Sequence, residues 1–144
     1  MPADDAEPDA LVDAMVQSAF TTMAVLNRAA GENDLSLTQL RVLGILSDRR
    51  LRMAQLAGYL GLEKSTLSGL VDRAERRGLL ERTPSPDDRR AIEVRLTAAG
   101  LELAERVRAE VESELAPSLV RLAAADRARL AGLLVRTLPA PDEG

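Results

Sequence analysis

The sequence of 144 residues contains neither cysteine nor histidine. Without cysteine the chain can form no disulfide, carry no thiol redox switch and offer no thiolate to a metal. Without histidine it cannot build a serine–histidine or cysteine–histidine catalytic pair, and it lacks the side chain that most often ligates transition metals. The sequence therefore predicts no catalytic residue, no metal site and no cofactor.

Aromatic residues and long apolar runs are also scarce. The chain has one phenylalanine, one tyrosine and no tryptophan, so a pocket that stacks a ligand between rings would be aromatic-poor. No apolar run reaches the ~18 residues of a membrane span. The acidic start, MPADDAEPDA, lacks the charged-then-apolar pattern of a signal peptide. We therefore expect a cytoplasmic protein with no membrane contact. Apolar residues still make up 46% of the chain, enough for one domain with a core.

The net charge of −4 is distributed unevenly. Residues 1–51 and 96–144 each carry more acidic than basic side chains, whereas residues 52–95 carry 9 basic and 7 acidic ones. A small local excess is by itself a weak indication, because most protein surfaces mix both signs. It gains weight because it coincides with the motif described next.

Residues 79–100, LLERTPSPDDRRAIEVRLTAAG, hold the most informative pattern in the chain. They predict a β-hairpin with strands at 80–83 and 92–96, joined by a proline-rich turn with Asp87, Asp88, Arg89 and Arg90 at its tip. In the second strand, apolar and charged residues alternate with the period of a half-buried strand. Two helices, at 53–60 and 64–77, precede the hairpin and are separated by Gly61. This order predicts a winged helix-turn-helix, which places its second helix in the DNA major groove and an arginine beside it.

Further helices are expected at 10–30, 37–47, 98–116 or beyond, and 125–138. The second of these has a capping box formed by Ser36 and Gln39, and it is apolar on most sides, so it should be central and buried. Pro117 should kink or interrupt the helix that begins at 98. The end helices carry apolar stripes, from Val12 to Leu26 and from Ala104 to Leu115, but no core of their own. We expect them to pack on a second copy, which would place two recognition helices about 34 Å apart, one turn of DNA.

Three stretches carry a family resemblance: LSLTQLRVLGIL, MAQLAGYLGLEKSTLSGLVDRAERRGLLER and PSPDDRRAIEVRLTAAG. The last holds an Asp-x-Arg element, Asp88 to Arg90, followed by a strand and Leu-Thr-x-x-Gly, which ends at Gly100. With these motifs the chain strongly resembles the MarR family of bacterial transcription regulators, closely over residues 35–100 and in outline beyond them.

The resemblance implies one domain, 1–144, mainly α with a small β-hairpin wing. The winged helix-turn-helix DNA-binding lobe would be 35–97, with N- and C-terminal dimerisation helices at 1–34 and 98–144. It implies a homodimer that binds a near-palindromic operator in double-stranded DNA and represses a neighbouring gene. A small anionic or aromatic ligand would release it.

We expect DNA contacts from the outward side of the helix at 64–77 and from the wing. Hydroxyls there reach base edges or phosphates, although they also suit helix capping. Arg73 either contacts phosphate or pairs with Asp88 to brace the wing, and we favour the brace. Arg90 is the expected DNA finger, while Arg76 and Arg77 suit the helix dipole. The predicted DNA-binding set is Arg52, Lys64, Ser65, Thr66, Ser68, Arg73, Arg82, Asp88, Arg89 and Arg90.

The resemblance also implies a ligand site between the dimerisation helices and the winged unit. Candidate lining residues are Phe20, Met23, Arg41, Tyr59 and Arg106, each of which ordinary core or surface packing also explains. Departures from the family pattern are Gly69, where arginine is frequent, Glu63 at the start of the recognition helix, and Arg52, where threonine often caps.

The sequence leaves three other functions open. The chain could be a constitutive winged-helix DNA binder without an effector, or a winged-helix protein–protein interaction module. The retained wing arginines and polar recognition helix argue against the module. A small enzyme is opposed by the absence of paired catalytic groups, a glycine-rich phosphate loop or a metal cluster.

Overall fold

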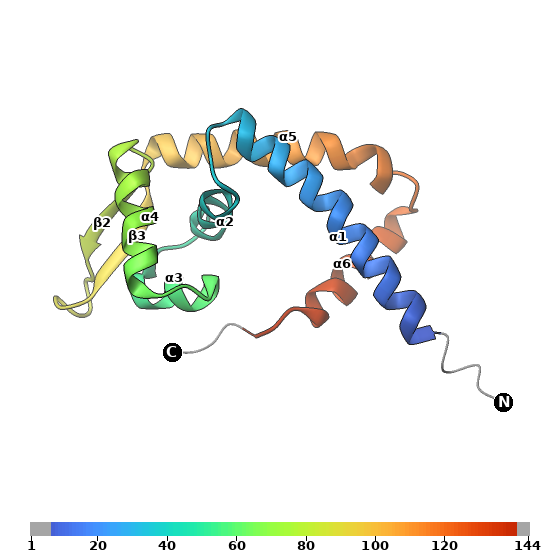
Figure 1. Cartoon of the computed structure of the whole chain (residues 1–144), viewed down its shortest axis with the longest axis horizontal. Coiled ribbons are helices and arrows are strands. Elements are labelled where there is room, and N and C mark those ends of the chain that lie inside the picture. Colours follow the sequence, from blue (N-terminus) through green and yellow to red (C-terminus); the bar gives the residue numbers. More distant parts are fainter. Residues whose placement is uncertain (1–6, 141–144) are drawn as a thin grey trace.

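A compact helical lobe with a small sheet stands at one side of the molecule, and two long helices lead away from it (Figure 1). The computed structural model describes residues 7–140. Along the chain lie α1 (Glu7–Glu32), α2 (Leu37–Leu46), β1 (Leu51–Arg52), α3 (Met53–Leu60), α4 (Lys64–Arg76), β2 (Leu80–Pro84), β3 (Ile92–Leu96), α5 (Ala98–Leu119) and α6 (Ala124–Thr137). The predicted fold, mainly α with a β-hairpin wing, is confirmed. Most of the acidic stretch 1–10 lies outside the described residues.

The sheet has three antiparallel strands in the order β1-β3-β2. The hairpin register pairs Leu80 with Leu96 and Pro84 with Ile92. Pro84 is tolerated because β2 is an edge strand, where a missing N–H breaks no ladder. The sequence did not predict β1, whose two residues pair with Val94 and Glu93. Two residues are too short to show a period, so only the tertiary pairing defines this strand.

Local signals explain where the helices begin and end. At α2, the Ser36 hydroxyl accepts from the Gln39 N–H at 3.1 Å and the Gln39 side chain accepts from the Ser36 N–H at 2.9 Å, which confirms the capping box. Gly61 and Gly78 end α3 and α4 with φ of 63° and 75°, where glycine carries no Cβ penalty. Pro117 lies inside α5 and does not interrupt it, since the helix continues to Leu119.

Two apolar cores meet at α2. The first fills the lobe between α2, α3, α4 and the sheet, with Leu56, Leu67, Val71 and Val94 fully buried. The second joins α1, α2 and α5 to the end of α4 through Ala29, Ala30, Leu35, Leu43, Leu79, Leu103 and Val107. Because α2 contributes to both, its predicted central position is confirmed.

The first half of α1 and all of α6 lie outside these cores. Residues 9–21 are exposed, with Leu11 at 62% and Phe20 at 74%, and α6 has no buried residue. The predicted stripe on α1 therefore faces solvent at Val12 and Val16 in a single chain. None of the described helices is long and apolar enough to cross a bilayer.

Candidate nucleic-acid interface

The recognition helix α4 has a buried face and a polar exposed face. Leu67, Leu70, Val71 and Ala74 point into the lobe core. Lys64, Ser65 and Thr66, at the N-terminal end, are exposed, and Ser68 is half-buried at the edge of the helix. The structure thus leaves three of the predicted α4 contacts open to an approaching duplex, with Ser68 beside them.

The wing tip is a hydrogen-bonded turn that presents its arginines outward. The Ser85 N–H donates to the Ala91 carbonyl at 2.9 Å, and the Ala91 N–H donates to the Asp88 carbonyl at 3.0 Å. The Asp88 side chain accepts from the Arg90 main-chain N–H at 3.0 Å. Arg89 and Arg90 are exposed. The Asp88 carboxylate therefore shapes the turn through the main chain of Arg90.

The wing is braced against α4 by Arg82. Its guanidinium donates to Asp72 at 2.6 Å, to Glu75 at 3.5 Å and to the Ser68 carbonyl at 3.2 Å. Arg82 and Leu80 share one face of β2, because strand side chains alternate, and Leu80 is buried in the core that α4 covers. The Arg82 donors are therefore committed to α4.

The favoured pairing of Arg73 with Asp88 was wrong. Among the ion pairs and hydrogen bonds of residues 9–140, none joins the Arg73 and Asp88 side chains. The Arg73 guanidinium lies back along α4 over Gly69, since a Cβ built at Gly69 would stand 3.5 Å from Arg73 Nη1. A side chain at position 69 would therefore make ordinary van der Waals contact with that arginine. The brace thus comes from the wing strand, and Arg73 stays exposed on α4.

Arg52 lies beside the wing base, a placement that depends on the unpredicted strand. As part of β1 it faces Glu93 of β3 across the sheet. Its N–H donates to the Gln55 side chain at 3.0 Å, which caps α3 without the usual threonine. The Arg52 side chain is exposed. The structure therefore brings Arg52 to the same end of the lobe as the start of α3.

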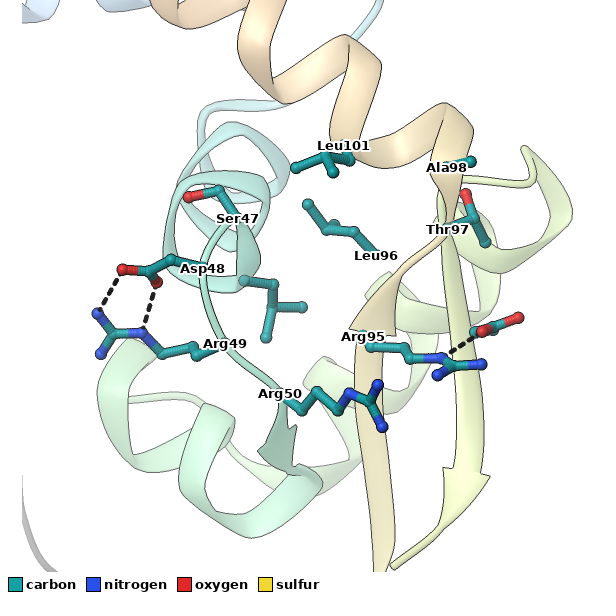
Figure 2. A pocket seen from close by; sticks show the side chains of 11 residues that line it. Ser47, Asp48, Arg49, Arg50, Arg95, Leu96, Thr97, Ala98 and Leu101 are labelled. Atoms are coloured by element: carbon teal, nitrogen blue, oxygen red, sulfur yellow. Dashed lines mark hydrogen bonds and ion pairs between the residues drawn. The ribbon is translucent and has the colours of Figure 1, made fainter.

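Arginines that the sequence analysis did not select surround a hollow of about 660 Å³ at the base of the wing (Figure 2). Arg49 pairs with Asp48 at 2.9 Å, and Arg95 pairs with Glu81. The hydrogen bond from Arg49, with its positive charge, lowers the pKa of Asp48. Because carboxylates neutralise two of its arginines, this hollow is a poor anion site.

A second, apolar hollow of about 1080 Å³ lies between α1, α2 and α5. Of the predicted ligand residues, Met23 and Arg41 line it, while Phe20, Tyr59 and Arg106 do not. Tyr59 packs against the lobe core, and its carbonyl accepts from Arg41 Nη2 at 3.1 Å. Gly44, Ala104 and Val111, which the sequence analysis did not select, are among the walls. No period in the sequence marks them, because the hollow is bounded by residues of four separate helices, α1, α2, α3 and α5.

Among residues 9–140, no group of three or more acidic side chains is placed to hold a metal ion.

The sequence model of the MarR family matches residues 33–91. The multiple antibiotic resistance protein MarR of Escherichia coli is 30% identical over 80% of this chain and 81% of its own length. The transcriptional regulator YfiV of Bacillus subtilis is 37% identical over 44% of this chain, which spans only 41% of that protein.

Solved structures agree with the sequence comparison. A mutant of E. coli MarR complexed with operator DNA has a TM-score of 0.68 at 26% identity, covering 92% of this chain and 96% of that one. Each match is a protein to which this chain is similar.

Proposed function

Because the chain belongs to the MarR family of DNA-binding transcription regulators, we propose that it binds an operator as a homodimer and represses a neighbouring gene. One observation carries the proposal. Lys64, Ser65 and Thr66 are exposed at the start of α4, the wing tip presents two exposed arginines, and Arg82 bonds the wing to α4. A helix for the major groove and an arginine for the minor groove are thus held as one unit.

The homodimer is supported by apolar surface that a single chain leaves in water. Large side chains on the first half of α1 and on α6 are 40% or more exposed, among them Leu11, Val12, Leu133 and Val135. So many large apolar side chains left exposed on two helices are typical of an interface. A two-fold dimer buries the same patch from both copies and gives two recognition helices for a two-fold operator.

Arg90→Ala is expected to weaken operator binding by about 1–3 kcal/mol, the usual cost of losing one specific contact. The narrow minor groove of A·T-rich DNA concentrates negative potential, which favours an inserted arginine. Arg90→Lys should recover only part of the loss, because it lacks the planar guanidinium. The measurement is equilibrium binding at fixed salt to an operator recovered from genomic DNA.

Two aspartates at the tip provide a matched control. Asp88→Ala removes the acceptor that shapes the turn and should weaken binding, although it also removes a negative charge. Asp87→Ala removes the same charge from an exposed position and should bind as tightly as the parent or slightly tighter. The finger assignment fails if Arg90→Ala binds like the parent while Asp88→Ala binds more tightly.

We further propose that a small, partly apolar anion regulates DNA binding from the hollow between α1, α2 and α5. Its walls are mostly aliphatic. Arg41 lies at the wall, where its guanidinium donates to the Tyr59 carbonyl and forms no ion pair with any residue of the described part of the chain. The hollow lies between the dimerisation helices and the lobe. A ligand that fits only one arrangement of the two would shift the equilibrium by its differential affinity.

Gly44→Met is expected to abolish this regulation and preserve operator binding. Gly44 lines the hollow, and a Cβ there meets nothing within 4 Å, so a longer side chain can start from this position and occupy part of the space. Gly58→Met, on α3 and equally open, is the control away from the hollow. Operator release is measured by titrating benzoate and its hydroxylated derivatives. If none of these compounds releases the parental protein from the operator, a constitutive DNA binder without an effector is favoured. If the parent and Gly44→Met are released equally, the ligand does not bind in this hollow.

A further inference from the structure

The C-terminal end of the recognition helix is held by the turn that joins α1 to α2. Arg77 caps α4, and its Nη1 donates to the Asp34 carbonyl at 2.6 Å. Its Nη2 donates to the adjacent Asn33 carbonyl at 3.2 Å. A planar guanidinium with parallel donors is suited to gripping two neighbouring oxygens. One side chain therefore ties the end of α4 to a turn more than forty positions away in sequence.

That turn is fixed to the dimerisation helices. Asp34 adopts φ of 54°, and the Leu35 N–H donates to the Ala30 carbonyl at 2.9 Å, which closes the end of α1. The Asn33 side-chain amide donates to the Ala29 carbonyl at 2.7 Å and to Glu110 of α5 at 3.1 Å. An ion pair between Arg28 and Glu114 joins the same two helices further along.

We infer that Arg77 is a positioning residue of the DNA-binding activity: by clamping the end of α4 to the α1–α2 turn, it sets the distance between the two recognition helices of the dimer. The inference rests on the proposed binding of DNA by a homodimer. Hydrogen bonds run without a break from α4 through Arg77, the turn and Asn33 to α5. A shift of the lobe against the dimerisation helices must break this path.

Two alternative roles for Arg77 predict different behaviour. As a phosphate contact it would lie near Ser65, but it stands roughly 18 Å further along the helix at 1.5 Å per residue. As a structural residue it would support the fold, but it is exposed, and the buried Leu35, Leu43 and Leu79 form the core beneath it. Its loss should therefore leave both the fold and the contacts within one half-site intact.

The test uses the full chain and an operator recovered from genomic DNA, with its two half-sites at native separation or one base pair closer or further apart. One base pair moves a half-site by about 3.4 Å. The parental protein should prefer the native separation. Arg77→Ala should reduce that preference, the ratio of affinities for native and altered spacing, by roughly 2- to 30-fold. Arg76→Ala is the matched control, because it removes the same charge from the next, exposed position and should keep the parental ratio.

Two further measurements separate a positioning role from the alternatives. The salt dependence of binding should be the same for Arg77→Ala and the parent, whereas loss of a phosphate contact lowers the slope by about 1. Asn33→Ala cuts the path on the other side of the turn and should also reduce the spacing preference, and it carries the test if circular dichroism shows Arg77→Ala unfolded. If Arg77→Ala keeps the parental ratio of affinities for native and altered spacing, or lowers the salt slope of DNA binding, the positioning role of Arg77 is wrong while the proposed DNA binding by a homodimer still stands. A parental protein without any spacing preference overturns the proposed dimeric function as well.

Discussion

Removal of residues 1–20 is expected to convert the protein to a monomer and to reduce operator affinity by a factor on the order of 10²–10⁴, the usual gain from joining two binding units. In the described part of this segment, residues 9–20, every side chain is exposed in the single chain. The buried Val25, Ala29 and Ala30 stay in place, so the lobe should remain folded. Sedimentation equilibrium and operator titration measure the two effects.

A pair of point variants tests the same surface without a truncation. Val16→Asp places a charge in the apolar stripe of α1, where Val16 is 47% exposed in the single chain. Gln17→Asp adds the same charge at the next exposed, polar position. Val16→Asp should dissociate the dimer, and Gln17→Asp should not. If the truncated chain or Val16→Asp binds the operator with parental affinity as a monomer, the terminal helices are not the dimer interface.

Gly100→Ala is expected to lower the free energy of unfolding by about 3 kcal/mol, the upper end of the usual cost of an overpacked site. A Cβ at Gly100 would stand 2.0 Å from the Leu79 carbonyl oxygen. That peptide cannot move freely, because the Leu79 N–H donates to Ala74 and the Leu79 carbonyl accepts from the Thr97 N–H, both at 3.0 Å. The start of α5 therefore packs directly on the backbone that follows α4.

The control for this variant is Gly58→Ala. Gly58 lies in α3 with nothing within 4 Å of an added Cβ, so alanine should raise stability by about 0.8–1 kcal/mol through helix propensity. Urea unfolding is measured at one protein concentration, because dimerisation shifts apparent stability. Equal stability of Gly100→Ala and the parent would show that the contact with Leu79 is not a constraint.

Local patterns were sufficient to predict most of the fold. The capping box at Ser36, the glycines at 61 and 78 and the alternation in β3 each act within a few residues, so they can be read from the chain. β1 could not be predicted, since two residues become a strand only when β3 lies beside them.

Side-chain partners were harder to predict than elements. Arg73 and Arg82 are both arginines near the wing. Arg82 forms the brace because its side chain lies on the face of β2 that packs against α4, which the sequence does not show. From the sequence, Arg77 was expected only to interact with the dipole of its own helix. Its bonds to the α1–α2 turn could not be predicted, because that turn is far away along the chain. A ligand site between the terminal helices and the winged unit stays a prediction. The walls of the hollow found there come from α1, α2, α3 and α5, whose relative placement no local pattern encodes.

Footprinting of the full-length protein on an operator recovered from genomic DNA, with the number of bound chains measured alongside, tests the central proposal most directly. We predict two protected half-sites on one face of the duplex, related by two-fold symmetry, with centres about 34 Å apart and two chains bound. A single protected half-site occupied by one chain, or binding without sequence preference at physiological salt, would contradict a dimeric operator-binding regulator.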